Sequence, residues 1–159
     1  MRFLARLVEG VLRDTKQPNS KVVVICESKP GIREIVESSL FPCEPFHADI
    51  AERRKDELLD EFRDGIIRVI VSSGSFNIGV NITDIRLIVY IDDPRDIKKY
   101  GQSSGCIGRD GLASRAIIVR GRLRFGDERV ERYIDQRRRQ CRRINIDGYL
   151  DSDETQERC

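Results

Sequence analysis

The chain has 159 residues, of which 39% are hydrophobic and 35% charged, and its formal net charge is +2. This length suits one domain with a short appendage and is enough to bury a core. The apolar runs are at most about five residues long, as from Val22 to Cys26, and therefore exclude a transmembrane helix.

The first half of the chain predicts helices that alternate with apolar strands. Residues 2–13 place apolar side chains at helical spacing, and the β-branched run 22–26 is typical of a strand buried on both faces. Ser28 and Pro30 suit the first turn of a helix that reaches about Leu40. We then expect a short strand over 44–47 and a charged helix over 51–63, ending at Gly65.

The second half continues the same alternation. We expect strands over 66–71, 86–91 and 115–119, a small-residue loop over 72–81, a helix from Pro94 to Gln102, a glycine-rich loop over 105–111 and a basic helix over 126–143. An acidic, turn-like tail follows residue 148. This alternation predicts an α/β fold, with a parallel sheet that carries helices on both faces.

Charge and cysteine content add two expectations. Of the 29 basic residues 23 are arginine, and ten of these lie between Arg120 and Arg143 beside only four acids. Arginine suits phosphate recognition, so this stretch is either an anion-binding face or a solvated helix.

The five cysteines are scattered, and the charged start of the chain does not form the apolar core of a secretory signal. We therefore expect reduced thiols and an intracellular protein.

Four sequence blocks recur in the order and spacing of a known family. They read VVVICESK from Val22, FHADIAER from Phe46, VSSGSFNIGVN from Val71 and QSSGCIGRDG from Gln102. Together they resemble the C-terminal RecA-like lobe of superfamily-2 DNA helicases of the RecQ type, with its blocks IIYCNSR, YHAGL, VATVAFGMGIN and QEIGRAGRDG. The resemblance spans about residues 20–120. It implies a RecA-like lobe over residues 1–125, followed by a basic helix and tail over 126–159.

The resemblance implies roles for individual residues. Arg109 matches the catalytic arginine finger, whose guanidinium stabilises the charge that develops on the γ-phosphoryl group. Nucleotide binding is implied for Gln102, Gly79, Asn81 and Arg109, and contact with single-stranded DNA for Ser28, Lys29, Ser72 and Ser73. Two alternatives stay open, because Ser28 could only cap the next helix and Gln102 could be an ordinary polar residue at a helix end.

The chain also departs from the family pattern. Cys106 stands where the family has an arginine, and Asp49 and Asn77 stand where it has glycines. Asp49 adds negative charge to a block that faces DNA in the family. The only histidine, His47, has a packing role there.

The 159 residues contain no G-x-x-x-x-G-K-[ST] phosphate loop. The family carries that loop on its N-terminal lobe, so ATP and Mg²⁺ are expected only together with that lobe. We therefore expect no ATP hydrolysis from this chain alone.

The end of the chain resembles the start of the zinc-binding subdomain that follows this lobe in the family. Cys141-Arg142-Arg143, Tyr149 and Cys159 carry that resemblance. Two thiolates cannot complete a four-ligand zinc site, so zinc is possible only at an incomplete site and no metal is expected.

The resulting functional hypothesis is the C-terminal lobe of an ATP-dependent 3′-to-5′ DNA helicase. Its expected partners are single-stranded DNA and an N-terminal helicase lobe, and we expect no association with a membrane. In a eukaryote we expect the protein in the nucleus. The alternative is a non-catalytic, helicase-derived module that binds nucleic acid or protein. Cys106 favours this alternative, whereas Arg109 and Gln102 favour the helicase lobe.

Overall fold

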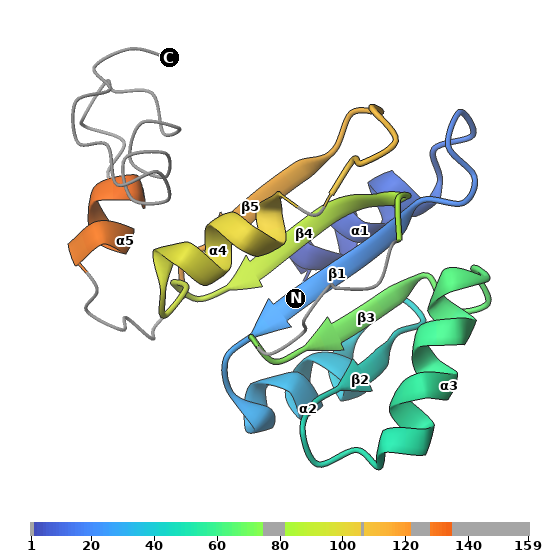
Figure 1. The fold of residues 1–159 in the computed structure, drawn as a ribbon, viewed down its shortest axis with the longest axis horizontal. Helices are drawn as coiled ribbons and strands as arrows, with labels where there is room; N and C mark the ends of the chain where they lie inside the picture. Colours follow the sequence, from blue (N-terminus) through green and yellow to red (C-terminus); the bar gives the residue numbers. More distant parts are fainter. Residues whose placement is uncertain (1, 75–81, 106, 122–127, 135–159) are drawn as a thin grey trace.

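A five-stranded parallel sheet forms the centre of the molecule (Figure 1). The computed structural model describes residues 2–74, 82–105, 107–121 and 128–134. The strands lie in the order β2-β3-β1-β4-β5. They are β1 (Lys21–Cys26), β2 (Glu44–Phe46), β3 (Val69–Ser72), β4 (Ile85–Ile91) and β5 (Arg115–Val119). The expected α/β class and parallel sheet are confirmed.

Among the described residues, helices alternate with these strands along the chain except between β3 and β4. They are α1 (Arg2–Leu12), α2 (Lys29–Ser38), α3 (Glu52–Arg63), α4 (Ile97–Ser104) and α5 (Glu128–Ile134). None of the helices in the described ranges is long and apolar enough to cross a membrane.

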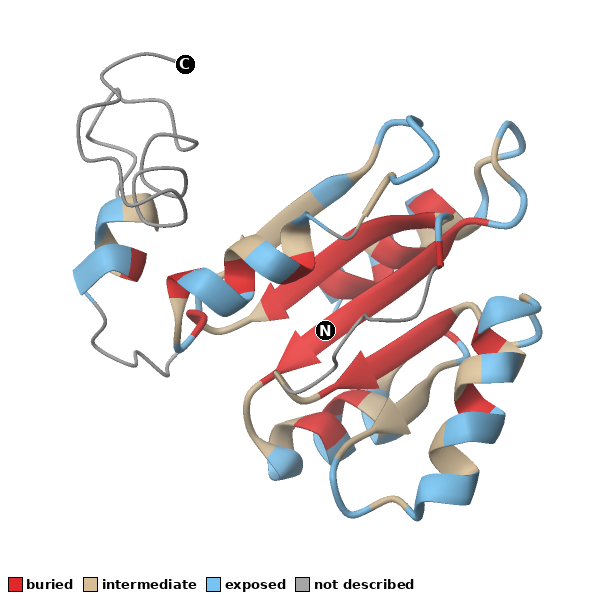
Figure 2. Cartoon of the chain, in the orientation of Figure 1, coloured by how far each residue is buried: buried red, intermediate tan, exposed pale blue. Residues whose placement is uncertain are grey.

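The two faces of the sheet bury two separate cores, because successive side chains of a strand point to opposite faces. In β1, Val22 and Val24 join a core with residues of α1 and α2, whereas Val23 and Ile25 join a core with residues of α3, α4 and α5. Figure 2 shows the resulting pattern, with buried central strands and helices whose outer faces are exposed. Helices therefore cover both faces, as expected.

Two elements begin three residues later than predicted. The strand expected to begin at Ile66 begins at Val69, because the backbone N–H of Ile67 donates to the carbonyl of Glu61 at 3.1 Å and Ile66 is 76% exposed. The helix expected from Pro94 begins at Ile97, after Asp96. The Asp96 carboxylate accepts a hydrogen bond from the Lys98 N–H at 2.8 Å and so caps the helix.

Helix α5 packs against the second core of the sheet. Of the helix predicted over 126–143, the described residues contain Glu128–Ile134. Val130 is buried in the second core, and the Tyr133 ring lies 5.0 Å from the Tyr100 ring of α4. Helix α5 follows residue 125, where the sequence predicts the end of the lobe, and these contacts place it in the second core of the sheet.

Candidate functional site

The predicted site residues lie at two opposite edges of the sheet. In a parallel sheet, connections that follow strands share the carboxyl edge and connections that precede strands share the amino edge. Ser28 and Lys29 follow β1 and Ser73 follows β3, which places these predicted DNA contacts at the carboxyl edge. Arg109 precedes β5, and the neighbouring N–H of Gly108 donates to the carbonyl of Ile85, the first residue of β4, at 3.3 Å. The loop over residues 107–111, called the arginine loop below, therefore lies at the amino edge.

The arginine loop is a tight turn that requires glycine. Gly108 and Gly111 have φ angles of 63° and 81°, in the left-handed region. A Cβ on Gly108 would lie 2.5 Å from the Ser114 hydroxyl and 2.8 Å from the Leu112 carbonyl oxygen. The loop presents Arg109 with an exposed side chain.

The other predicted nucleotide-binding residues are only partly covered by the structure. Gln102 is exposed on the last turn of α4, which leads toward the arginine loop. Gly79 and Asn81 lie outside the described residues, as does Cys106, so their predicted roles stay predictions.

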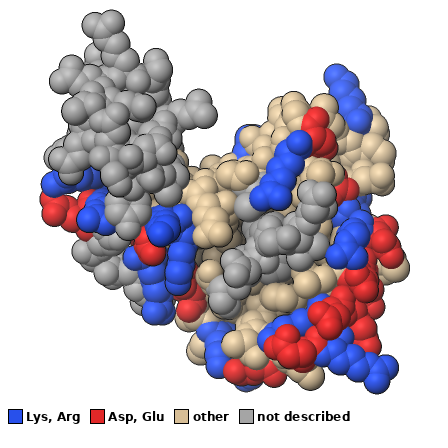
Figure 3. Space-filling view, in the orientation of Figure 1, with Lys and Arg blue, Asp and Glu red and all other residues tan. Residues whose placement is uncertain are grey.

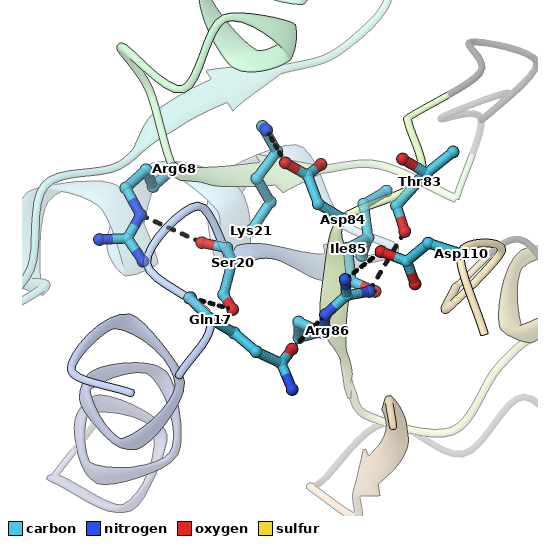
Figure 4. A network of polar contacts seen from close by, with 9 residues as sticks. All are labelled: Gln17, Ser20, Lys21, Arg68, Thr83, Asp84, Ile85, Arg86 and Asp110. Carbon is cyan, nitrogen blue, oxygen red and sulfur yellow. Dashed lines mark hydrogen bonds and ion pairs between the residues drawn. The ribbon is translucent and has the colours of Figure 1, made fainter. Parts of the chain in front are cut away.

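A buried arginine anchors the arginine loop (Figure 4). Arg86, near the start of β4, forms an ion pair with Asp110, and its guanidinium also donates to the Gln17 side chain and, at 3.2 Å, to the carbonyl of Thr83. The hydrogen bond from Arg86 holds the pKa of Asp110 below its ordinary value. Sequence reasoning missed Arg86; the available signal was a single basic residue inside an apolar strand.

Two more basic residues belong to the same amino-edge network. Lys21 is buried and forms an ion pair with Asp84. Arg68 donates through Nε to the carbonyl of Ser20 at 3.1 Å, and its buried Nη2 has no hydrogen-bond partner. Together with Arg86, these side chains connect the segments that precede β1, β3 and β4.

At the carboxyl edge, hydrogen bonds already engage most of the predicted DNA contacts. The Ser28 hydroxyl accepts a hydrogen bond from the Gly31 N–H at 3.1 Å and so caps α2. Ser72 is fully buried, and its hydroxyl donates to the carbonyl of Ser73 at 2.9 Å. Ser73 is partly exposed, so of Ser72 and Ser73 only Ser73 reaches the surface.

Lys29 is exposed but paired. Its ammonium lies 2.7 Å from both carboxylate oxygens of Asp49, and this hydrogen bond lowers the pKa of Asp49. The negative charge of Asp49 therefore neutralises Lys29, one of the predicted DNA contacts.

Two further basic residues form ion pairs at this edge. Arg95 reaches the Glu27 carboxylate at 3.4 Å. Arg120 donates two bonds of 3.1 Å to the buried Asp93 and one of 2.8 Å to Glu131 of α5. The hydrogen bonds that Arg120 donates to Asp93 and Glu131 raise its pKa further above the ordinary value, so Arg120 stays charged.

On the face seen in Figure 3, acidic and basic side chains of the described residues lie next to one another rather than in separate patches. A groove of about 590 Å³ lies between α2 and the end of β2, beside the Lys29–Asp49 pair. Its lining contains both signs of charge, with Lys29 and Arg33 facing the same space as Glu34, Glu37 and Asp49. His47 also lines this groove, and its Nδ1 is buried without a hydrogen-bond partner.

Metal ligands do not gather within the described ranges. These ranges hold no group of three or more His, Cys, Asp or Glu side chains that could bind a metal ion. Cys26 and Cys43 are free thiols, and burial raises the pKa of Cys43. Cys141 and Cys159, the predicted partial zinc ligands, lie outside the described residues.

Comparison with known families agrees with this arrangement. The model of the helicase conserved C-terminal domain matches residues 2–111. The chain belongs to this family of superfamily 2 helicase domains. The helicase domain match covers β1 to β4, both glycines of the arginine loop and every predicted site residue except the two tail cysteines.

The relatives of this helicase C-terminal domain include DNA and RNA helicases. An ATP-dependent DNA helicase RecQ of Pasteurella multocida is 27% identical over 121 residues, which are 74% of this chain and 18% of the relative. DEAD-box ATP-dependent RNA helicase 14 of Arabidopsis thaliana is 29% identical over 125 residues, 77% of this chain and 19% of the relative. The chain thus spans less than a fifth of the length of these relatives. The RecQ type is therefore not singled out.

Solved structures support the fold of the helicase domain. The helicase domain of Pyrococcus furiosus Hef superimposes with a TM-score of 0.61 at 22% identity, over 83% of this chain and 27% of that one. This likeness confirms a RecA-like helicase fold.

Proposed function

We propose that the chain is the C-terminal lobe of an ATP-dependent 3′-to-5′ DNA helicase of RecQ type. In this proposal it supplies an arginine finger and part of a single-stranded nucleic-acid track to a two-lobe enzyme. It does not hydrolyse ATP alone, because the phosphate loop and the Mg²⁺ ligands would come from an N-terminal lobe. The similarity to a RecQ protein supports the DNA assignment.

The observation that carries the proposal is the exposed position of Arg109 on an anchored loop. Backbone and side-chain bonds at Gly108 and Asp110 hold the loop against the start of β4. A guanidinium carried on a loop that is held in this way needs little backbone reorganisation when charge develops on a phosphoryl group supplied by a second lobe. ATP and Mg²⁺ would provide the phosphoryl chemistry, and Arg109 would stabilise its charge.

The test restores a two-lobe protein, using a related N-terminal lobe, and measures its DNA-stimulated turnover of ATP. We expect Arg109→Ala to lower kcat by roughly a thousandfold or more. Arg115→Ala is the matched control, because Arg115 is an exposed arginine at the start of β5, on the same edge. Unchanged turnover in Arg109→Ala, beside an active wild type, would show that this residue is not the finger.

The similarity to DEAD-box proteins supports RNA as the other nucleic acid. Matched single-stranded DNA and RNA oligonucleotides, titrated against the chain by fluorescence anisotropy, distinguish the two. A clear preference for RNA would overturn the DNA assignment and leave the helicase lobe in place.

Cys106 and the paired cations of the carboxyl edge favour a second candidate, the non-catalytic binding module. Under that alternative the restored two-lobe protein would bind nucleic acid but show no turnover.

A further inference from the structure

Three ion pairs concentrate at the carboxyl edge of the sheet. Within four residues of a strand end, the described residues contain four acids and three bases, namely Glu27, Asp49, Asp92 and Asp93 against Lys29, Arg95 and Arg120. Each of the three bases is bound to one of these acids. The surface that would have to attract a phosphate backbone therefore carries no excess of positive charge among these residues.

The ion pairs of Lys29 and Arg95 are exposed at the surface, whereas those of Arg120 connect α5 to the sheet. Arg120 pairs with both the buried Asp93 and Glu131 of α5, so its role is structural. Lys29 and Asp49 are 58% and 59% exposed, and Arg95 is 57% exposed. Exposed pairs of this kind are weak and exchange readily, so their partners could be replaced by another anion.

Glu27 also lies directly over the segment that follows β3. A Cβ added to Gly74 would lie 2.3 Å from the Glu27 carboxylate, whose side chain is only 17% exposed. Gly74 follows Ser73, the partly exposed serine predicted to contact DNA. A negative charge is therefore held against the backbone that a phosphate would approach.

We propose that Asp49 and Glu27 weaken nucleic-acid binding at the carboxyl edge by occupying the ammonium of Lys29 and the guanidinium of Arg95. The inference rests on the proposed function, because it concerns the same nucleic-acid surface. A carboxylate and a phosphate compete for the same N–H donors. A strand can use Lys29 or Arg95 only after it displaces the internal carboxylate, so these two side chains contribute little to affinity in the wild type.

The experiment measures binding of the full chain to a labelled single-stranded oligothymidylate by fluorescence anisotropy across a salt series. Asp49→Asn should tighten Kd about two- to fivefold, the range that corresponds to the release of an exposed ion pair. It should also steepen the plot of log affinity against log salt by about 0.7, the value for one additional phosphate contact on a single strand. Glu27→Gln, which has nearly the same shape, should act in the same direction through Arg95.

Two further variants make the test specific. Asp64→Asn makes the same change in net charge at the exposed end of α3, at the amino edge, and should leave both quantities nearly unchanged. Lys29→Gln should have little effect by itself, but in the Asp49→Asn background it should abolish the gain. This pairing separates a released lysine from a general increase in positive charge.

Each alternative result is decisive. Equal gains in Asp49→Asn and Asp64→Asn, or a gain that survives Lys29→Gln, would overturn the inference and leave nucleic-acid binding intact. No binding by the wild type or any variant at low salt would instead contradict the proposed function itself, and the inference with it.

Discussion

Arg86 shows how one buried charge can organise a functional loop from a distance. Its guanidinium meets the Asp110 carboxylate, the Gln17 side chain and two backbone carbonyls, so most of its donors are satisfied although the side chain is buried. Asp110 immediately follows Arg109. The ion pair therefore positions the arginine loop through its neighbour, while Arg109 itself stays exposed.

This ion pair predicts a specific dependence of stability on pH. Because Arg86 lowers the pKa of Asp110 in the folded chain, the unfolded state binds a proton at this carboxyl more readily than the folded state. The stabilisation is therefore present above about pH 4 and is lost as the pH falls below that value. Asp110→Asn should flatten the decline in the free energy of unfolding between about pH 5 and about pH 3, as measured by urea titration.

The control for this prediction is Asp64→Asn, which changes an exposed aspartate at the end of α3. Its decline with falling pH should match that of the wild type. A decline in Asp110→Asn as steep as in the wild type would show that the Arg86–Asp110 pair contributes nothing to acid sensitivity.

At the scale of elements, α5 is attached to the lobe by both apolar and polar contacts. Val130 is buried among residues of the second core. Tyr133 stacks at an angle on Tyr100, with its hydroxyl donating to the Tyr100 hydroxyl at 3.1 Å. Arg120 adds the ion pair with Glu131. A helix of seven residues is too short to be stable alone, so these contacts hold it in place.

Truncating the apolar anchor of α5 should therefore destabilise the lobe. Val130→Ala removes two buried methyl groups and should lower the free energy of unfolding by about 2 kcal/mol. Arg132→Ala is the control on the same helix, because its pair with Glu128 is exposed and should change stability by about 0.5 kcal/mol or less. Urea titration measures both, and equal effects would mean that α5 does not share the core.

At the scale of the whole molecule, the two cores are coupled through the strands they share. Val23 and Val24 are adjacent and fully buried, yet they contribute to different cores. Three tyrosines, Tyr90, Tyr100 and Tyr133, lie on the second face, whereas α1 and α2 pack against the first. Loss of β1 would open both cores at once.

This coupling predicts one cooperative unfolding transition. Urea curves followed by tyrosine fluorescence and by helical circular dichroism should coincide, although the three core tyrosines lie in the second core and the helices lie on both faces. Val23→Ala and Val24→Ala should each shift both curves together, by roughly 2 to 3 kcal/mol. Separate midpoints for the two probes would show that the faces unfold independently.

The amino-acid sequence by itself determined the elements and their parallel arrangement. Helical spacing over 2–13 and the β-branched runs at 22–26 and 86–91 are local patterns, and local hydrophobic periodicity is enough to specify element type. The four sequence blocks were also sufficient to indicate the helicase C-terminal domain, which the family match over residues 2–111 confirms. Relatives of this chain include both a RecQ DNA helicase and a DEAD-box RNA helicase, so the family match is to the helicase C-terminal domain as a whole.

Only the tertiary structure decided which charges meet. Lys29 and Asp49 are 20 residues apart, and Arg86 and Asp110 are 24 apart, so no local pattern pairs them. The first pair joins the segments that follow β1 and β2, the two strands on either side of β3, and the second joins β4 to the loop that precedes its neighbour β5. The burial of Ser72 inside the sheet likewise depends on covering both of its faces. Ion pairs and burial depend on distances in space, which the sequence specifies only through the complete fold.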